Sequence, residues 1–88
     1  MELFQEIAET IRAAVDADAE VHILDPRQDG VHLEALVISQ SFDGLSLVKQ
    51  QQVVMKALKE HFATSLHALG LRTFTPAKWH EQKSKFGF

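Results

Sequence analysis

SLHALGLRTFTPAKW, residues 65–79, joins a strand pattern to a helix pattern within one short segment. Its first half, from His67 to residue 74, has the β-type composition and alternation of a strand. Thr75-Pro76 then predicts a helix over about residues 76–84, because Thr is a good N-cap and Pro suits the first helical position. His67 lies at the entrance of this strand, where its polar tip can reach water, so the sequence alone is more typical of a surface or edge residue than of a metal ligand.

Regular patterns also occur upstream of this stretch. Apolar residues at spacings of three and four predict a helix over about residues 2–17. Alternation predicts a strand at 20–25 and a longer one at 31–39, joined across the turn-forming pair Asp29-Gly30. Ser46 is predicted to be the N-cap of a second helix over about 47–62. The apolar stripe of this helix consists of Leu47, Val54, Leu58 and Phe62, with Val48, Met55 and Ala63 beside it. The polar residue Gln51 also falls on this stripe.

The order helix, strand, strand, helix, strand, helix predicts an α+β fold. We expect a small three-stranded mixed sheet, α-β-β-α-β-α, with the helices packed on one face. The chain of 88 residues is long enough for one modest core, so we expect a single domain spanning residues 1–88. Trp79, Phe42 and Phe74 are expected to lie in that core.

Composition narrows the possible functions. The chain has no cysteine, which excludes disulfides, thiol nucleophiles and cysteine-based zinc sites. Residues 1–45 contain ten acids and two bases, a net charge of −8. Residues 46–88 contain two acids and seven bases, a net charge of +5. Such asymmetry marks either a surface for nucleic acid or an acidic protein, or two faces that neutralise each other. The N-terminal segment is acidic and amphipathic, unlike a signal peptide, and no stretch is long enough to cross a membrane, so we expect a cytoplasmic protein without membrane contact.

Enzyme templates fit the sequence poorly. The chain has no G-x-S-x-G nucleophile motif, phosphate-binding loop or dinucleotide-binding glycine pattern. We therefore expect a protein that is not an enzyme.

The five histidines are the remaining candidates for chemistry: His22, His32, His61, His67 and His80. None has a local metal-ligand spacing, so folding would have to assemble any site. If the second and third strands run parallel and adjacent, His32 and His67 lie at the same end of the sheet. We expect His22 to point outward from its strand, and His61 and His80 to be solvated.

Three segments together resemble the BolA-like family, and most closely its acid-stress-associated IbaG branch. They are FDGLSLVKQQQVVMKAL (42–58), LHALGLRTFTPAKW (66–79) and the terminal Gly-Phe. The resemblance covers about residues 20–88 and depends on three motifs occurring in order: F-x-G-x-S, His-Ala at the third strand, and T-P-x-x-W. Gln50-Gln51 stands where most family members carry Arg-His, which fits the IbaG branch and weakens a nucleic-acid role. Lys78 stands where the family usually has Glu.

The resemblance implies a fold related to the type II KH topology and a role as the partner of a monothiol glutaredoxin. The pair would share a bridging [2Fe–2S] cluster, held on one side by the glutaredoxin cysteine and a glutathione thiol. The family's near-invariant histidine matches His67, and its second ligand, in a variable loop, matches His32. The protein would then be a monomer without cofactor when free and a heterodimer with its partner. Only neutral imidazole binds metal, and imidazole ordinarily titrates at about pH 6.5. Mild acid is therefore expected to weaken the binding of metal by histidine.

Two alternatives stay open at this point. One is a KH-like, nucleic-acid-binding transcriptional regulator, which the +5 half favours and the net charge of −3 opposes. The other is a module that docks glutaredoxin through its basic C-terminal half and binds no metal.

Overall fold

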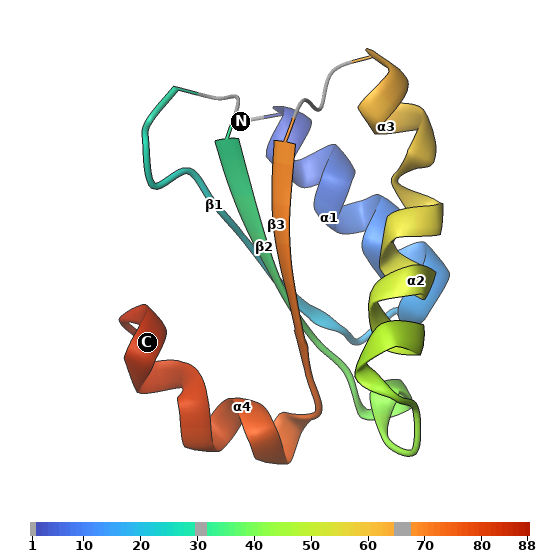
Figure 1. Cartoon of the computed structure of the whole chain (residues 1–88), viewed down its shortest axis with the longest axis vertical. Helices are drawn as coiled ribbons and strands as arrows, with labels where there is room; N and C mark the ends of the chain where they lie inside the picture. The colour runs from blue at the N-terminus through green and yellow to red at the C-terminus, as the bar shows by residue number, and fades with distance from the viewer. Residues whose placement is uncertain (1, 30–31, 65–67) are drawn as a thin grey trace.

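The computed structural model describes residues 2–29, 32–64 and 68–88. In chain order the elements are α1 (Glu2–Val15), β1 (Glu20–Leu24), β2 (His32–Ile38), the 3-10 turn η1 (Gln40–Phe42), α2 (Leu47–Ala57), α3 (Lys59–Thr64), β3 (Ala68–Phe74), α4 (Pro76–Gln82) and the 3-10 turn η2 (Lys83–Phe86) (Figure 1). This order confirms the α+β class with a three-stranded sheet. None of the helices in these ranges is both long and apolar enough to cross a bilayer.

The sheet is mixed, with β2 in the centre. β1 runs antiparallel to β2, and β3 runs parallel to it, so β1 and β3 form the two edges. The second and third strands are therefore parallel and adjacent, which is the condition under which their first residues lie at the same end of the sheet. A central strand is covered on both faces, which explains why β2 ends in the continuous apolar run Leu36-Val37-Ile38, all three buried.

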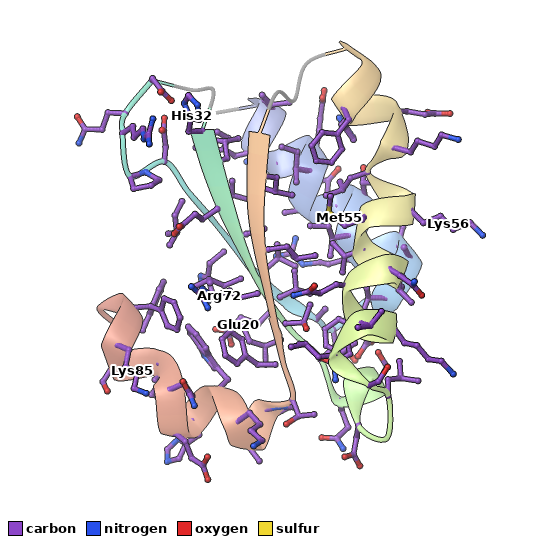
Figure 2. All side chains as sticks on the ribbon, viewed as in Figure 1. Glu20, His32, Met55, Lys56, Arg72 and Lys85 are labelled. Carbon is purple, nitrogen blue, oxygen red and sulfur yellow. The ribbon has the colours of Figure 1, made fainter. Side chains whose placement is uncertain are left out.

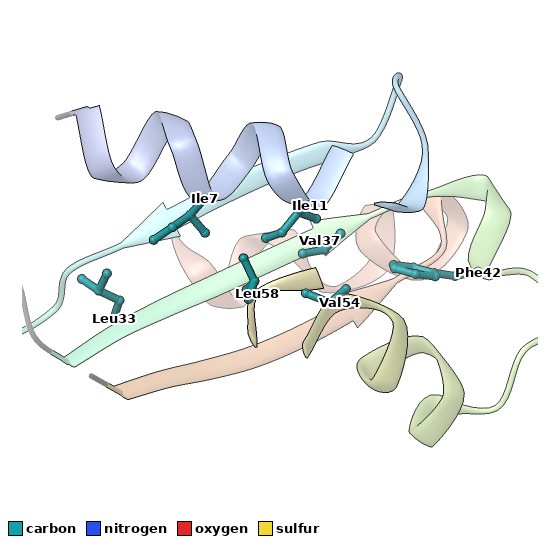
Figure 3. Close-up of a cluster of buried hydrophobic side chains, with 7 residues drawn as sticks. All are labelled: Ile7, Ile11, Leu33, Val37, Phe42, Val54 and Leu58. Carbon is teal, nitrogen blue, oxygen red and sulfur yellow. The ribbon is translucent and has the colours of Figure 1, made fainter. Parts of the chain in front are cut away.

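The larger core lies between the sheet and the helices α1 and α2. Leu33 and Val37 point to this side from β2, and the seven buried members of the cluster are Ile7, Ile11, Leu33, Val37, Phe42, Val54 and Leu58 (Figure 3). Burial of these apolar side chains provides most of the driving force that orders β2.

A second core lies on the opposite face of the sheet. Leu36 and Ile38 pack there against Trp79 of α4, with Phe74 and Phe86 around them. The expectation that all helices pack on one face is therefore wrong, because α4 covers the face opposite α1 and α2 (Figure 1). The reason is the apolar end of β2, which needs cover on both sides.

The expected helix over residues 47–62 is divided into α2 and α3 at Leu58, whose φ of −91° and ψ of 3° depart from helical values. No Gly or Pro marks this position. The bend keeps the buried Leu58 and the partly buried Phe62 against the larger core. The predicted apolar stripe is also wrong at its start, where Leu47 and Val48 are 58% and 64% exposed.

Both predicted N-caps are confirmed. The Ser46 hydroxyl accepts a hydrogen bond from the Lys49 N–H at 3.2 Å, and the Thr75 hydroxyl accepts one from the Lys78 N–H at 3.4 Å. Pro76 occupies the first turn of α4, as its fixed φ favours.

Candidate functional site

The candidate site lies at the end of the sheet where β2 and β3 begin. His32 is the first residue of β2, and its backbone pairs with that of Ala68, the first residue of β3. Ala68 directly follows His67 in the sequence. His67 itself lies outside the described residues, so its predicted role stays a prediction.

Asp29 holds His32 in place through both of its carboxylate oxygens. Oδ1 accepts a hydrogen bond from the backbone N–H of His32 at 3.0 Å, and Oδ2 lies 2.9 Å from the imidazole Nδ1. The two contacts fix the backbone and the ring of the same residue. The two contacts therefore orient the imidazole, which lies at the start of β2 (Figure 2).

The carboxylate also selects the tautomer of the ring. An ionised carboxylate only accepts hydrogen bonds, so Nδ1 must carry the proton that it donates to Asp29. In the neutral ring, Nε2 then has the free lone pair. The His32 side chain is 49% exposed. A carboxylate–imidazole pair of this kind is the usual outer support of a histidine metal ligand.

A tight loop brings Asp29 to this position. The Asp29 N–H donates to Oδ1 of Asp25 at 3.2 Å, and the Gln28 N–H donates to the Asp25 carbonyl at 3.0 Å. Gln28 has a φ of 55°, in the left-handed region that is costly for a side chain. Sequence reasoning treated Asp29 only as a turn former, although its position three residues before His32 was the available signal.

The other histidines have separate roles. His22 packs against Trp79 and Phe88, with ring centroids 5.7 Å and 4.4 Å away, and its Nε2 lies against the carboxylate of Glu20. The expectation that His22 simply points outward is therefore wrong, because α4 and η2 cover that face of the sheet. His80 is exposed, as expected.

His61 does not match its expected solvated position either. It is half-buried, and its Nε2 lies 3.2 Å from the Thr10 hydroxyl, so the ring links α3 to α1. The two helices approach each other only in the folded protein, which hides this contact from the sequence.

The described residues do not form a complete metal site. Within residues 2–29, 32–64 and 68–88, no group of three or more His, Cys, Asp or Glu side chains is placed to hold a metal ion. His32 can therefore act only as one member of a ligand set that is completed from elsewhere.

Two of the three glutamines of α2, Gln50 and Gln51, line the outer side of β3. The Gln50 amide donates to the carbonyls of Phe42 and Leu45, and its carbonyl accepts from the Thr73 hydroxyl at 2.7 Å. Gln51 donates to the carbonyl of Leu71 at 3.4 Å. The polar side chain of Gln51 on the expected apolar stripe is thus explained by the backbone carbonyl of Leu71, to which it donates at the edge of the sheet.

Comparison with protein families supports the resemblance seen in the sequence. The model of the family described as BolA-like protein matches residues 4–78. The acid stress protein IbaG of Escherichia coli (strain K12) is 37% identical over 70 residues, which cover 78% of this chain and 80% of that protein. BolA-like protein 1 of Mus musculus is 36% identical over 56 residues, covering 64% of this chain and 41% of that one.

Solved structures show the same fold. BolA1 from Arabidopsis thaliana superposes with a TM-score of 0.73 at 28% identity, covering 85% of this chain and 93% of that chain. A bolA protein homologue from Coxiella burnetii gives a TM-score of 0.70, also at 28% identity, covering 86% and 94%.

Proposed function

The chain belongs to the BolA-like protein family, and from this premise we propose that it is a non-enzymatic partner of a monothiol glutaredoxin in the cytoplasm. In this role it supplies histidine to a [2Fe–2S] cluster shared by the two proteins, for cluster assembly, trafficking or iron sensing. The ligands proposed from this chain are His67 and His32.

The observation that carries the proposal is the hydrogen bond between His32 Nδ1 and Asp29. It leaves Nε2 of a half-exposed, oriented ring as the ligand atom. The backbone pairing of His32 with Ala68, the neighbour of His67 in the chain, supports a shared position for the two histidines at one end of the sheet.

The donor set fits a shared cluster better than one held by this chain alone. The chain has no cysteine, whereas clusters of this type are held mainly by thiolates, so thiols must come from the partner and from glutathione. Histidine in place of thiolate removes negative charge from a bound cluster and raises its potential. In this proposal the chain contributes two neutral imidazoles, and Asp29 orients the ring of His32 and keeps its Nδ1 protonated.

Reconstitution tests this proposal. The protein is mixed with a monothiol glutaredoxin, glutathione, iron and sulfide, and visible absorption and circular dichroism are recorded. We expect a heterodimer whose cluster spectrum differs from that of the glutaredoxin homodimer. His67→Ala should abolish the difference, and His32→Ala should weaken it.

The matched control is His80→Ala, which removes an exposed histidine from α4. This variant should leave the spectrum of the heterodimer unchanged. An unchanged glutaredoxin spectrum with no complex would refute the whole proposal. A complex that survives loss of both His32 and His67 with no change in spectrum would instead indicate docking without metal binding.

A nucleic-acid-binding regulator is the second candidate, supported by three exposed lysines, Lys49, Lys56 and Lys59, on α2 and the start of α3. Contacts of lysine with phosphate make binding fall steeply as salt rises. Titration of a labelled DNA duplex at two salt concentrations tests it, and the absence of binding at low salt excludes it.

A further inference from the structure

The outer edge of β3 is open along its C-terminal half. No strand among the described residues pairs with β3 on the side away from β2. The Phe74 carbonyl accepts from the Ser39 N–H at 3.0 Å, so it points toward the chain that continues β2. Because backbone groups alternate along a strand, the N–H and C=O groups of Leu71 and Thr73 point the other way, away from β2.

A groove follows this edge. Its volume is about 560 Å³, and five consecutive residues from Leu71 to Thr75 line it. Successive strand residues face opposite sides of a sheet, so a single cavity touches all five only where it runs along the edge. The N-terminal part of α2 and the preceding loop form one wall, and α4 contributes to the other.

Gln51 occupies the edge as a neighbouring strand would. Its side-chain amide donates to the outward-facing Leu71 carbonyl at 3.4 Å, which is long for a hydrogen bond and therefore weak. This contact satisfies one strand group without closing the edge. Gln50, in contrast, makes three hydrogen bonds. Two of them hold the carbonyls of Phe42 and Leu45 in the loop before α2, and the third joins this side of the groove to Thr73 of β3.

The two walls differ in chemistry. On the α2 side, Leu45 and Leu47 are 39% and 58% exposed. On the α4 side, Arg72 and Lys78 are exposed and basic. Asp43 is an acidic group that also lines the groove, two residues before Leu45 in the loop.

We propose that this groove binds an extended segment of a partner protein, which adds to β3 as a fourth strand. The segment alternates apolar and acidic residues, because alternate side chains of an added strand meet Leu45 and Leu47 on one side and Arg72 and Lys78 on the other. Its backbone bonds to Leu71 and Thr73 and displaces the Gln51 amide. The inference concerns a different part of the molecule from the histidine site and does not depend on the cluster.

A fluorescein-labelled peptide of alternating valine and glutamate tests the proposal by anisotropy titration. We expect saturable binding that Arg72→Glu with Lys78→Glu weakens about tenfold, the scale expected for two charge pairs at a partly exposed interface. Gln51→Ala should bind at least as well as the native protein, because the Leu71 carbonyl is released. The control Lys56→Glu changes a side chain that points away from the sheet (Figure 2) and should leave binding unchanged.

Two further probes separate strand addition from simple charge attraction. The same peptide with N-methylated alternate amides keeps its charge but cannot donate to β3, so it should not bind. Hydrogen exchange of the Leu71 and Thr73 amides should slow with the native peptide and stay fast with the methylated one. Equal binding of both peptides would overturn the proposal.

Three other outcomes would also overturn it. Equal binding of a valine–lysine peptide would remove the assigned chemistry. Competition by single-stranded DNA with no slowing of exchange would assign the groove to nucleic acid. Slow exchange of both amides in the free protein, with a dimer mass in sedimentation, would assign the edge to a second copy of this chain.

Discussion

Replacement of Asp29 by asparagine gives the sharpest test of the proposed ligand. The native carboxylate accepts hydrogen bonds from both the backbone N–H and the Nδ1–H of His32, at 3.0 and 2.9 Å. An amide has one acceptor and one donor, so it cannot serve both. If its oxygen keeps the backbone N–H, its NH₂ faces Nδ1 and favours the tautomer with the proton on Nε2. That proton blocks the nitrogen proposed to bind iron.

The expected order of cluster binding is native protein, then Asp29→Ala, then Asp29→Asn. Alanine leaves the ring free to choose its tautomer, whereas asparagine imposes the wrong one. Loss of such an outer support typically lowers metal affinity about 10- to 100-fold. The cost in folding stability should be about 1 kcal/mol or less, because Asp29 and His32 have side chains that are 36% and 49% exposed.

Two measurements check this reasoning. Long-range ¹H–¹⁵N spectra of the free protein report the tautomer of His32, and reconstitution with glutaredoxin reports cluster binding. Asp18→Asn, the same change at an exposed aspartate, is the control and should affect neither. A native ring with its proton on Nε2, or an Asp29→Asn variant that binds the cluster as well as the native protein does, would refute the argument.

Three stability predictions follow from the packing, each measured by denaturant unfolding. Leu58→Ala should lower the free energy of unfolding by about 3–5 kcal/mol, because the side chain is fully buried at the bend between α2 and α3. The control Val48→Ala, at a 64% exposed position, should lower it by less than about 0.5 kcal/mol. Equal losses in the two variants would contradict the assignment of Leu58 to the core. Gly70→Ala should stabilise the folded protein by about 0.4–1 kcal/mol, because alanine has less conformational entropy than glycine in the unfolded chain. The added Cβ would lie 3.5 Å from Glu34 Cγ, an ordinary van der Waals distance. A loss of stability would show that β3 does not tolerate a side chain at this position. Thr75→Ala should lower the free energy of unfolding by about 1 kcal/mol, because it removes the N-cap of α4. Trp79 should then become exposed at a lower denaturant concentration. Unchanged stability and tryptophan fluorescence would show that this cap does not stabilise α4.

Some features of the fold are local enough to be predicted from residues close together in the sequence. The Ser46 and Thr75 caps are of this kind, because each hydroxyl bonds a backbone group three residues away. The strands and helices follow from apolar periods of two and about three to four residues. The bend at Leu58 escaped prediction because it carries no Gly or Pro and depends on packing against the sheet.

The candidate site was predictable only in part. The sequence singled out His32 and, through the family resemblance, paired it with His67, and the parallel pairing of β2 with β3 is consistent with that prediction. The support from Asp29 was missed because the residue was interpreted only as a turn former, although its spacing of three residues from His32 allows the contact. The contacts of His22 and His61 were missed because they join elements far apart in the chain.

Residue identity and neighbours within a few positions are enough to predict the order of strands and helices, the two caps and the absence of any thiol ligand from this chain. The folded structure was needed to show that α4 covers the second face of the sheet, that Asp29 sets the tautomer of His32 and that β3 has an open edge beside Gln51. Each of these depends on the distance between groups in space. That distance is fixed only when burial of the two cores brings the segments together.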